Sequence, residues 1–381
     1  MLCCKKKKKN EEPSLYGKLW RTFIRPHRSE YNLRDLGPAR FEIEGRRVCR
    51  TDIEIKNKRG QTIQASFFEI LDSTIATNSC VLYAHTHSGS RLEALGVLVP
   101  SISNGLNMLA IDMTGSGLSD GQYVSFGINE RDDIDAAVSY LRDKLRIPNV
   151  ILWGRSMGAV TLIQYASEHE GALCMVLDSP FANLKRLCKE VAKKRAKVPS
   201  IITSMFLPLL KKTIRKKGQF SINDLDISSY ARKVRTPTIF IASKDDIFVS
   251  HEHSVTLRDS LASAKKEIIY CKGGHNDSRP REFLKEVMKK ALEYSNGNPN
   301  GNLRPKVNDF PLDSGNVGNV GNVGNKGEPF LQNQEAQALV QPQFNIPGPM
   351  TAAGQNHNHN HNFQNRVNLV EGRVNHNGRI N

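Results

Sequence analysis

Two stretches of alternating apolar and polar residues follow Val48, with a short polar turn between them. Ile53 and Ile55 alternate with polar neighbours, and so do Ile63, Ala65 and Phe67. A period of two places successive side chains on opposite faces of a strand. Residues 57–60, which end in glycine, are suited to the turn. The pattern predicts a β-hairpin.

Four apolar runs without alternation come next along the chain. They lie at Cys80–Ala84, Asn107–Ile111, Val150–Trp153 and Ala172–Leu177. Helical segments follow the first three, including residues 129–144, which carry their apolar residues on one face. Strands that are apolar throughout are buried on both faces, and their alternation with helices is typical of parallel sheets. We therefore expect an α/β fold, with a mostly parallel central sheet and helices on both of its faces.

A basic segment, residues 179–235, interrupts this alternation. It contains two predicted helices, Phe181–Lys197 and Ile201–Lys217, with a proline between them. The alternation resumes with strands at Thr238–Ala242 and Glu267–Cys271, a helix between them, and a last helix that Pro280 begins. We predict one folded domain over residues 15–295, in which residues from about 181 to 235 form a short helical cap.

The residues outside this domain have a different composition. Residues 1–14 contain a polybasic run, and residues 296–381 contain three Gly-Asn-Val repeats and tracts rich in Asn and Gln. Both have too few large apolar residues to form a core, so we predict that they are disordered. His357, His359 and His361 fit an Asn-rich tract better than a metal site. We expect no metal and no cofactor.

The net charge of +16 is concentrated in two segments. Residues 1–28 carry nine Lys and Arg against two Glu, and residues 181–235 carry fifteen against three acidic residues. This distribution indicates anionic partners at defined places. The expected partner is an anionic membrane surface, bound through Lys5–Lys9 and the basic cap, and the alternative is a solvated face that aids solubility. Gly115 and Gly117 are too short a motif for a dinucleotide site, and nothing indicates nucleic acid.

Seven cysteines are present, without the spacing of zinc sites or a secretory signal ahead of them. Several lie in apolar runs, which favours free buried thiols in a reducing compartment over disulfides. No stretch is apolar for long enough to cross a bilayer. The expected location is therefore cytoplasmic, with peripheral attachment to a membrane through the N-terminus.

The N-terminus supplies the argument for that attachment. Cys3 and Cys4 stand beside Lys5–Lys9, which fits S-acylation of the cysteines and contact of the lysines with anionic lipid. A solvated start explains the same residues equally well. Apolar residues at helical spacing follow between Leu15 and Ile24, and this helix would either pack on its own domain or lie in a membrane interface.

Residues 150–159 hold the strongest chemical signal in the chain. An apolar strand leads into Gly154-Arg155-Ser156-Met157-Gly158, and a helix follows. This order is typical of a nucleophile elbow, whose turn lifts a serine hydroxyl above the sheet. The glycines lack the Cβ atoms that would collide there. Ser156 is therefore the predicted nucleophile, and the amide of Met157 is a predicted donor to an oxyanion.

An acid and a base are expected after later strands, in that order. Asp246 follows the strand that ends at Ala242, and His275 follows two glycines after Cys271. We predict that His275 takes the Ser156 proton and that Asp246 orients the imidazole. Asp245 is interpreted as a solvated residue, and His251 and His253 are rivals of His275 by residue type only, because they open a helix soon after the acid.

A second oxyanion donor is expected after the strand Cys80–Ala84. The amide of His87 is our candidate for it. Thr86 stands where such loops usually have glycine, and a β-branched residue narrows the accessible backbone conformations.

Four motifs together resemble one group of enzymes. They are Asp112–Ser125, Trp153–Ala159, Leu177–Phe181 and Lys244–Phe248. Over roughly residues 15–295 the chain resembles α/β-hydrolases labelled serine aminopeptidase-like or unassigned serine peptidases in plants and protists. Relatives of that group include the ABHD hydrolases that remove palmitate from proteins. The resemblance implies the α/β-hydrolase fold and a Ser156–Asp246–His275 triad.

The expected function is hydrolysis of a carboxylic ester or thioester in an acyl-containing small molecule, a lipid or an acylated protein. A serine peptidase or aminopeptidase is the alternative, but an aminopeptidase needs carboxylates for the substrate's ammonium group, and the basic cap has few. A catalytically silent, membrane-associated scaffold is the second alternative.

Overall fold

The computed structural model describes residues 15–72, 78–194 and 200–296. In these residues nine strands form one sheet, in the order β1-β2-β3-β5-β4-β6-β7-β8-β9. Six strands, β5, β4, β6, β7, β8 and β9, run parallel in this order. The strands β1, β2 and β3 form an antiparallel edge that joins β5. The strands are β1 (Arg40–Ile43), β2 (Arg46–Lys56), β3 (Thr62–Ile70), β4 (Ser79–Ala84), β5 (Asn107–Ile111), β6 (Asn149–Arg155), β7 (Cys174–Asp178), β8 (Thr238–Ser243) and β9 (Lys266–Cys271).

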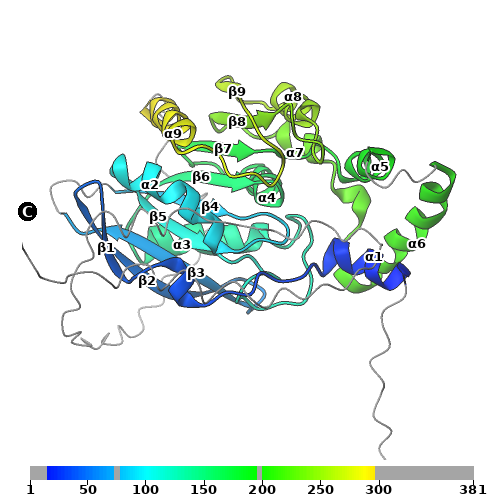
Figure 1. Ribbon diagram of the computed structural model, residues 1–381, viewed down its shortest axis with the longest axis horizontal. Helices are drawn as coiled ribbons and strands as arrows, with labels where there is room; N and C mark the ends of the chain where they lie inside the picture. The colour runs from blue at the N-terminus through cyan, green and yellow to red at the C-terminus, as the bar shows by residue number, and fades with distance from the viewer. Residues whose placement is uncertain (1–14, 73–77, 195–199, 297–381) are drawn as a thin grey trace, which may run out of the picture. The chain divides into compact units, whose positions relative to one another are not determined.

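Helices cover both faces of this sheet, because its parallel strands carry apolar residues on both (Figure 1). In β4, Leu82 belongs to the core under α3 and α4, whereas its neighbour Val81 belongs to the core under α2 and α9. The predicted hairpin and the mostly parallel α/β architecture are confirmed. The helices are α1 (Leu15–Ile24), α2 (Leu95–Ser103), α3 (Arg131–Asp143), α4 (Met157–Ala166), α5 (Leu184–Lys194), α6 (Ser200–Gly218), α7 (Ile227–Ala231), α8 (His251–Ser260) and α9 (Arg281–Asn296), with 3-10 turns η1 (Leu33–Leu36), η2 (Arg91–Ala94) and η3 (Ile222–Asp224).

The first helix packs on its own domain, which decides between the two alternatives for its apolar stripe. Helix α1 lies beside α6 of the basic segment (Figure 1). Trp20 and Ile24 are buried, and the Tyr16 hydroxyl donates to the carbonyl of Leu209 at 2.8 Å. Trp20 and Ile24 of the apolar stripe therefore pack in the core of the domain. The basic residues of α1 remain at the surface.

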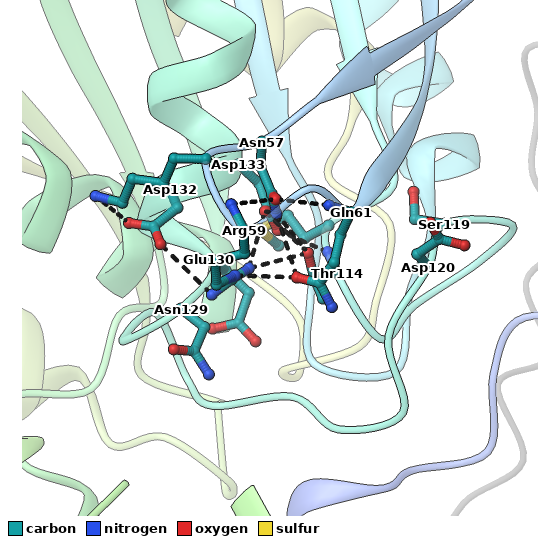
Figure 2. A network of polar contacts seen from close by, with 12 residues as sticks. Asn57, Arg59, Gln61, Thr114, Ser119, Asp120, Asn129, Glu130, Asp132 and Asp133 are labelled. Carbon is teal, nitrogen blue, oxygen red and sulfur yellow. Dashed lines mark hydrogen bonds and ion pairs between the residues drawn. The ribbon is translucent and has the colours of Figure 1, made fainter. Parts of the chain in front are cut away.

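A buried polar network holds the glycine-rich motif Asp112–Ser125, which follows β5 (Figure 2). Asp133 of α3 accepts hydrogen bonds from Asn57 Nδ2 at 2.7 Å, from the Thr114 amide at 2.7 Å and from the Thr114 hydroxyl at 2.9 Å. Arg59 adds an ion pair at 3.2 Å. Burial raises the pKa of Asp133 to about 7, although the hydrogen bonds from Asn57 and Thr114 act in the opposite direction. The network joins the hairpin turn, the motif and α3.

The same motif closes around Asp112. A Cβ at Gly117 would lie 2.3 Å from the Asp112 carboxylate, so only glycine fits there. The Asp112 carboxylate also accepts from the Tyr31 hydroxyl at 2.6 Å and from the Arg91 amide at 2.7 Å. Asp112 and Gly117 of the motif Asp112–Ser125 therefore have structural roles: the glycine allows close packing, and the aspartate accepts buried hydrogen bonds.

Candidate active site

Ser156 lies at a sharp turn between β6 and α4. Its φ of 51° and ψ of −111° are unusual for a residue with a side chain, and such strain is common at active sites. The two glycines of the motif make the turn possible. A Cβ at Gly154 would lie 2.7 Å from the Ala159 amide nitrogen, and one at Gly158 would lie 2.1 Å from the Ala84 carbonyl oxygen. The Ser156 amide donates to the Asp178 carbonyl of the neighbouring strand at 2.8 Å.

The structure brings Ser156, His275 and Asp246 together in a chain of hydrogen bonds. His275 Nε2 is 3.0 Å from Ser156 Oγ, and His275 Nδ1 is 2.7 Å from Asp246 Oδ2. The carboxylate fixes the tautomer by this contact, since it can only accept and Nδ1 must then donate. Nε2 is left as the acceptor for the serine hydroxyl. This geometry suits removal of the serine proton by the imidazole.

Asp246 is held by its own backbone turn. Its Oδ1 accepts from the amides of Phe248 and Val249, both at 2.8 Å, which leaves Oδ2 to face the imidazole. Asp245 turns elsewhere and accepts from the Gly273 amide at 3.2 Å. The choice between these two acids is thus explained by the bend that follows β8.

The two rival histidines lie outside this chain of hydrogen bonds. His251 pairs with Glu252 at 3.1 Å at the start of α8. His253 is buried, where Nδ1 accepts from the Ala182 amide at 3.1 Å and Nε2 lies 3.2 Å from Glu190 of α5. His253 thereby connects α8 with α5 and is a structural residue.

The two candidate oxyanion donors, the amides of Met157 and His87, lie in different surroundings. Met157 is the first residue of α4, where helix amides have no partner inside the helix. The His87 ring stacks on Phe126 at 4.7 Å, and its Nε2 donates to the Phe23 carbonyl at 2.6 Å. Burial lowers the pKa of His87 to about 4, so its ring is neutral near pH 7. The role of the His87 amide stays a prediction.

Thr86 fits this loop without strain. It is absent from the described residues that have positive φ, so the position does not require glycine. Glu93 of η2 accepts from both the Thr86 amide at 3.0 Å and the Thr86 hydroxyl at 2.6 Å. No sequence pattern pointed to Glu93, because Thr86 and Glu93 meet only in the folded loop.

A second cluster missed by sequence reasoning lies beside the histidine. Arg155, Asp178 and Arg279 form ion pairs below the loop that carries His275. Burial alone would raise the pKa of Asp178, but the charges of Arg155 and Arg279 outweigh it and lower this pKa to about 2. Asp178 is therefore ionised at neutral pH.

Several of the predicted residues lie outside the described ranges. Cys3, Cys4 and Lys5–Lys9 lie outside them, as do residues 195–199 of the basic segment and residues 297–381. Within the ranges, the cysteines are free thiols, and no group of His, Cys, Asp and Glu is placed to hold a metal ion. None of the helices described there is long and apolar enough to cross a membrane.

Comparison with known proteins agrees with the fold. Residues 101–227 match the family described as serine aminopeptidase, S33. Protein YqkD of Bacillus subtilis (strain 168) is 26% identical over 225 residues, which span 58% of this chain and 73% of that protein. The alpha/beta hydrolase domain-containing protein 17C of Homo sapiens is 25% identical over 190 residues, or 49% of this chain and 50% of that protein. The match thus spans about half the length of the mammalian relative.

Solved structures show the same fold at lower identity. The Pyrococcus furiosus esterase Pf2001 superposes with a TM-score of 0.54 at 22% identity, covering 70% of this chain and 96% of that one. Est1E of Butyrivibrio proteoclasticus, solved with ferulic acid, gives a TM-score of 0.51 at 15% identity, covering 65% and 100%. The chain is a member of the α/β-hydrolase superfamily, and it is a hydrolase.

Proposed function

We propose that this protein is a serine hydrolase that cleaves carboxylic ester or thioester bonds of acyl-containing small molecules, lipids or acylated proteins. The observation that carries the proposal is the continuous hydrogen-bonded chain from Ser156 Oγ through His275 to Asp246. A scaffold that had lost catalysis would not need to keep three separate loops in this register.

The reaction follows from the roles of these three groups. Ser156 Oγ attacks the acyl carbon while His275 Nε2 takes its proton, and the amide of Met157 donates to the developing oxyanion. The imidazolium gives that proton to the departing alcohol or thiol, which leaves an acyl-enzyme. Water then attacks the acyl carbon while His275 Nε2 takes one of the protons of that water, and the imidazolium gives this proton to Ser156 Oγ as the carboxylic acid leaves. Asp246 stabilises the imidazolium in both halves.

The basic segment favours an ester or thioester over a peptide with a free amino terminus. Recognition of an ammonium group requires an available carboxylate. Glu190 of α5 is already engaged by Arg186 at 2.8 Å and by His253 at 3.2 Å. Asp224 accepts from the Ser221 amide at 3.3 Å, and Asp226 is the third acidic residue of a segment with fifteen basic ones. The positive charge of the segment therefore gives the aminopeptidase alternative less support.

A fluorophosphonate probe tests the proposal directly, because it forms a covalent bond with an activated serine and releases fluoride. We expect the purified parent protein to be labelled at Ser156, as mapped by peptide mass spectrometry, and the Ser156→Ala variant to remain unlabelled. Labelling of both proteins alike, or of neither, would show that Ser156 is not an activated nucleophile.

We also propose that the enzyme works at the cytoplasmic face of a membrane. Helices α1 and α6 lie side by side and contain no acidic residue. Lys18 and Arg21 of α1 are exposed, as are four basic residues of α6: Lys212, Arg215, Lys216 and Lys217. Lys217 also stacks over the Trp20 ring at 4.8 Å, which ties the two helices together. A face of one sign of charge favours anionic lipid headgroups.

The N-terminal residues extend this proposal. Lys5–Lys9 precede α1 in the sequence, and Cys3 and Cys4 precede the lysines. The lysines would add a salt-sensitive attraction, and acyl chains on the cysteines would make the attachment durable. Such a location would bring Ser156 to lipid or lipid-anchored substrates.

Flotation with vesicles of phosphatidylcholine, with and without phosphatidylserine, tests the role of the basic face. Each basic residue near an anionic surface contributes about 1 kcal/mol, so changing Lys212, Arg215 and Lys216 to glutamine should weaken binding about 100-fold. The matched control changes three lysines of α9 (Lys285, Lys289 and Lys290) and should bind as the parent does. Equal binding by all three proteins would rule out the basic face.

Fractionation of cells tests the acyl anchor. We expect the parent protein in the membrane fraction and a Cys3→Ser/Cys4→Ser variant to be lost from it, and unchanged fractionation of the variant would contradict the anchor.

A further inference from the structure

The loop that carries His275 is held by two arginines that contact its backbone. Arg155 Nη2 donates to the carbonyl oxygens of His275 at 2.7 Å and Asp277 at 2.8 Å. Arg279 Nη1 donates to the carbonyl oxygen of Gly274 at 3.1 Å. Three carbonyls around the imidazole are thus bound by guanidinium groups. The loop has glycines at 273 and 274, so without these contacts its backbone would have many accessible conformations.

Asp178 joins the two arginines to each other. Its carboxylate accepts from Arg279 Nε at 2.9 Å and from Arg279 Nη2 at 2.8 Å, in a two-point contact. Arg155 Nε lies 3.5 Å from the same carboxylate. Only 4% of the Asp178 side chain and 3% of the Arg279 side chain are exposed, so solvent screens these charges weakly.

Asp178 also fixes the other half of the site. It is the last residue of β7, and its carbonyl accepts the amide of Ser156 at 2.8 Å. Arg155 is the residue before Ser156 and is paired in register with Asp178 across β6 and β7. The nucleophile and the histidine loop are therefore both fastened to one residue at the end of a central strand.

We propose that Asp178, Arg155 and Arg279 are positioning residues that hold the His275 loop in register with Ser156. The inference rests on the proposed function, because it concerns the distance between Ser156 Oγ and His275 Nε2. Guanidinium groups suit this task, since one planar group donates in several directions, whereas a lysine has a single nitrogen. Asp178 faces two arginines and so acts on the imidazole through the backbone, unlike Asp246, which contacts it.

The experiment compares Arg155→Met, Arg279→Met and Asp178→Asn with the parent, and Arg142→Met serves as the matched control. Arg142 is a surface residue paired with its neighbour Asp143 at 2.7 Å. Steady-state hydrolysis of a short acyl ester gives kcat and KM, and the fluorophosphonate reaction gives the rate at which Ser156 is activated. All measurements are made well below the unfolding temperature of each variant.

We expect kcat and the fluorophosphonate rate to fall together, by about 100-fold, with little change in KM, because a displacement of about 1 Å has an effect of this size. Arg155→Lys should fall between parent and Arg155→Met. Amides of residues 272–278 should exchange hydrogen faster in the variants. Because both arginines hold one loop, the Arg155→Met/Arg279→Met double variant should lose less activity than the product of the two single losses.

Two kinds of failure can be told apart. A parent protein that is not labelled at Ser156 would overturn the proposed function. A labelled parent together with arginine variants that keep its kcat and labelling rate, even at a lower unfolding temperature, would overturn the positioning role alone and leave a purely structural one. If Asp178→Asn does not fold, the two arginine variants decide, since Arg155→Met removes two contacts to the loop, Arg279→Met removes one, and both leave Asp178 in place.

Discussion

Replacing Ser156 by alanine is expected to lower kcat for ester hydrolysis by about 10⁴- to 10⁶-fold, and His275→Ala should have an effect of similar size. The serine hydroxyl is a weak nucleophile until its proton is removed, and His275 Nε2 lies 3.0 Å away to remove it. The two residues act as a unit, so the double variant should be no slower than either single one. Asp246→Asn should cost about 10⁴-fold, because an amide can impose the wrong tautomer on the imidazole.

The control for these measurements is His251→Ala. His251 lies at the start of α8 and pairs with Glu252 outside the chain of hydrogen bonds, so its loss should leave kcat within about twofold. A mock purification from host cells that do not express the protein measures the rate contributed by contaminating esterases. A Ser156→Ala protein that keeps more than a tenth of the parent rate would contradict the assignment of the nucleophile.

The regular part of the fold could be predicted because its signal is local. Each buried parallel strand is a continuous apolar run, and the residues that face the sheet from α3, such as Ile134 and Leu141, recur at helical spacing. The turn around Ser156 could be predicted for a similar reason. Its two glycines are required by contacts with backbone atoms, and this leaves a short pattern in the sequence.

The contacts that support the candidate site could not be predicted, because they join residues far apart in the chain. Arg279 and Asp178 are separated by 101 positions, and Arg155 and the His275 carbonyl by 120. An arginine in a basic protein carries no mark of its burial. Glu93 likewise has an ordinary sequence context and becomes a partner of Thr86 only when η2 folds against β4.

The packing of α1 could not be predicted for a different reason. Its apolar stripe is equally suited to a protein core and to a membrane interface, since both accept the same side chains. Trp20 and Ile24 are buried in the same core as two apolar residues of α6, Leu210 and Ile214. The sequence of α1 alone does not indicate this partner helix. Phe23 then reaches the candidate oxyanion loop through its carbonyl, which His87 binds.

Replacing Gly158 by alanine should damage stability and catalysis together. The new Cβ would lie 2.1 Å from the Ala84 carbonyl oxygen and 2.7 Å from the His85 carbonyl oxygen. Both are backbone atoms at the end of β4 and cannot turn away as a flexible side chain could. Helix α4 would have to move back from the sheet, carrying the Met157 amide with it. Overpacking of this kind costs about 3 kcal/mol or more, despite the higher helix propensity of alanine.

Gly96→Ala in α2 is the matched control for this change. A Cβ at Gly96 meets no heavy atom within 4 Å, so the same substitution in another helix should be neutral or should stabilise by up to about 1 kcal/mol. Thermal unfolding should therefore place Gly158→Ala roughly 10 °C below the parent and Gly96→Ala at or above it. The fluorophosphonate rate should fall at least tenfold in Gly158→Ala alone, since about 1.4 kcal/mol of lost transition-state stabilisation has that effect. Parent-like stability and labelling in Gly158→Ala would show that the turn has room to relax, and that the close approach of α4 to β4 is not what sets the position of Ser156.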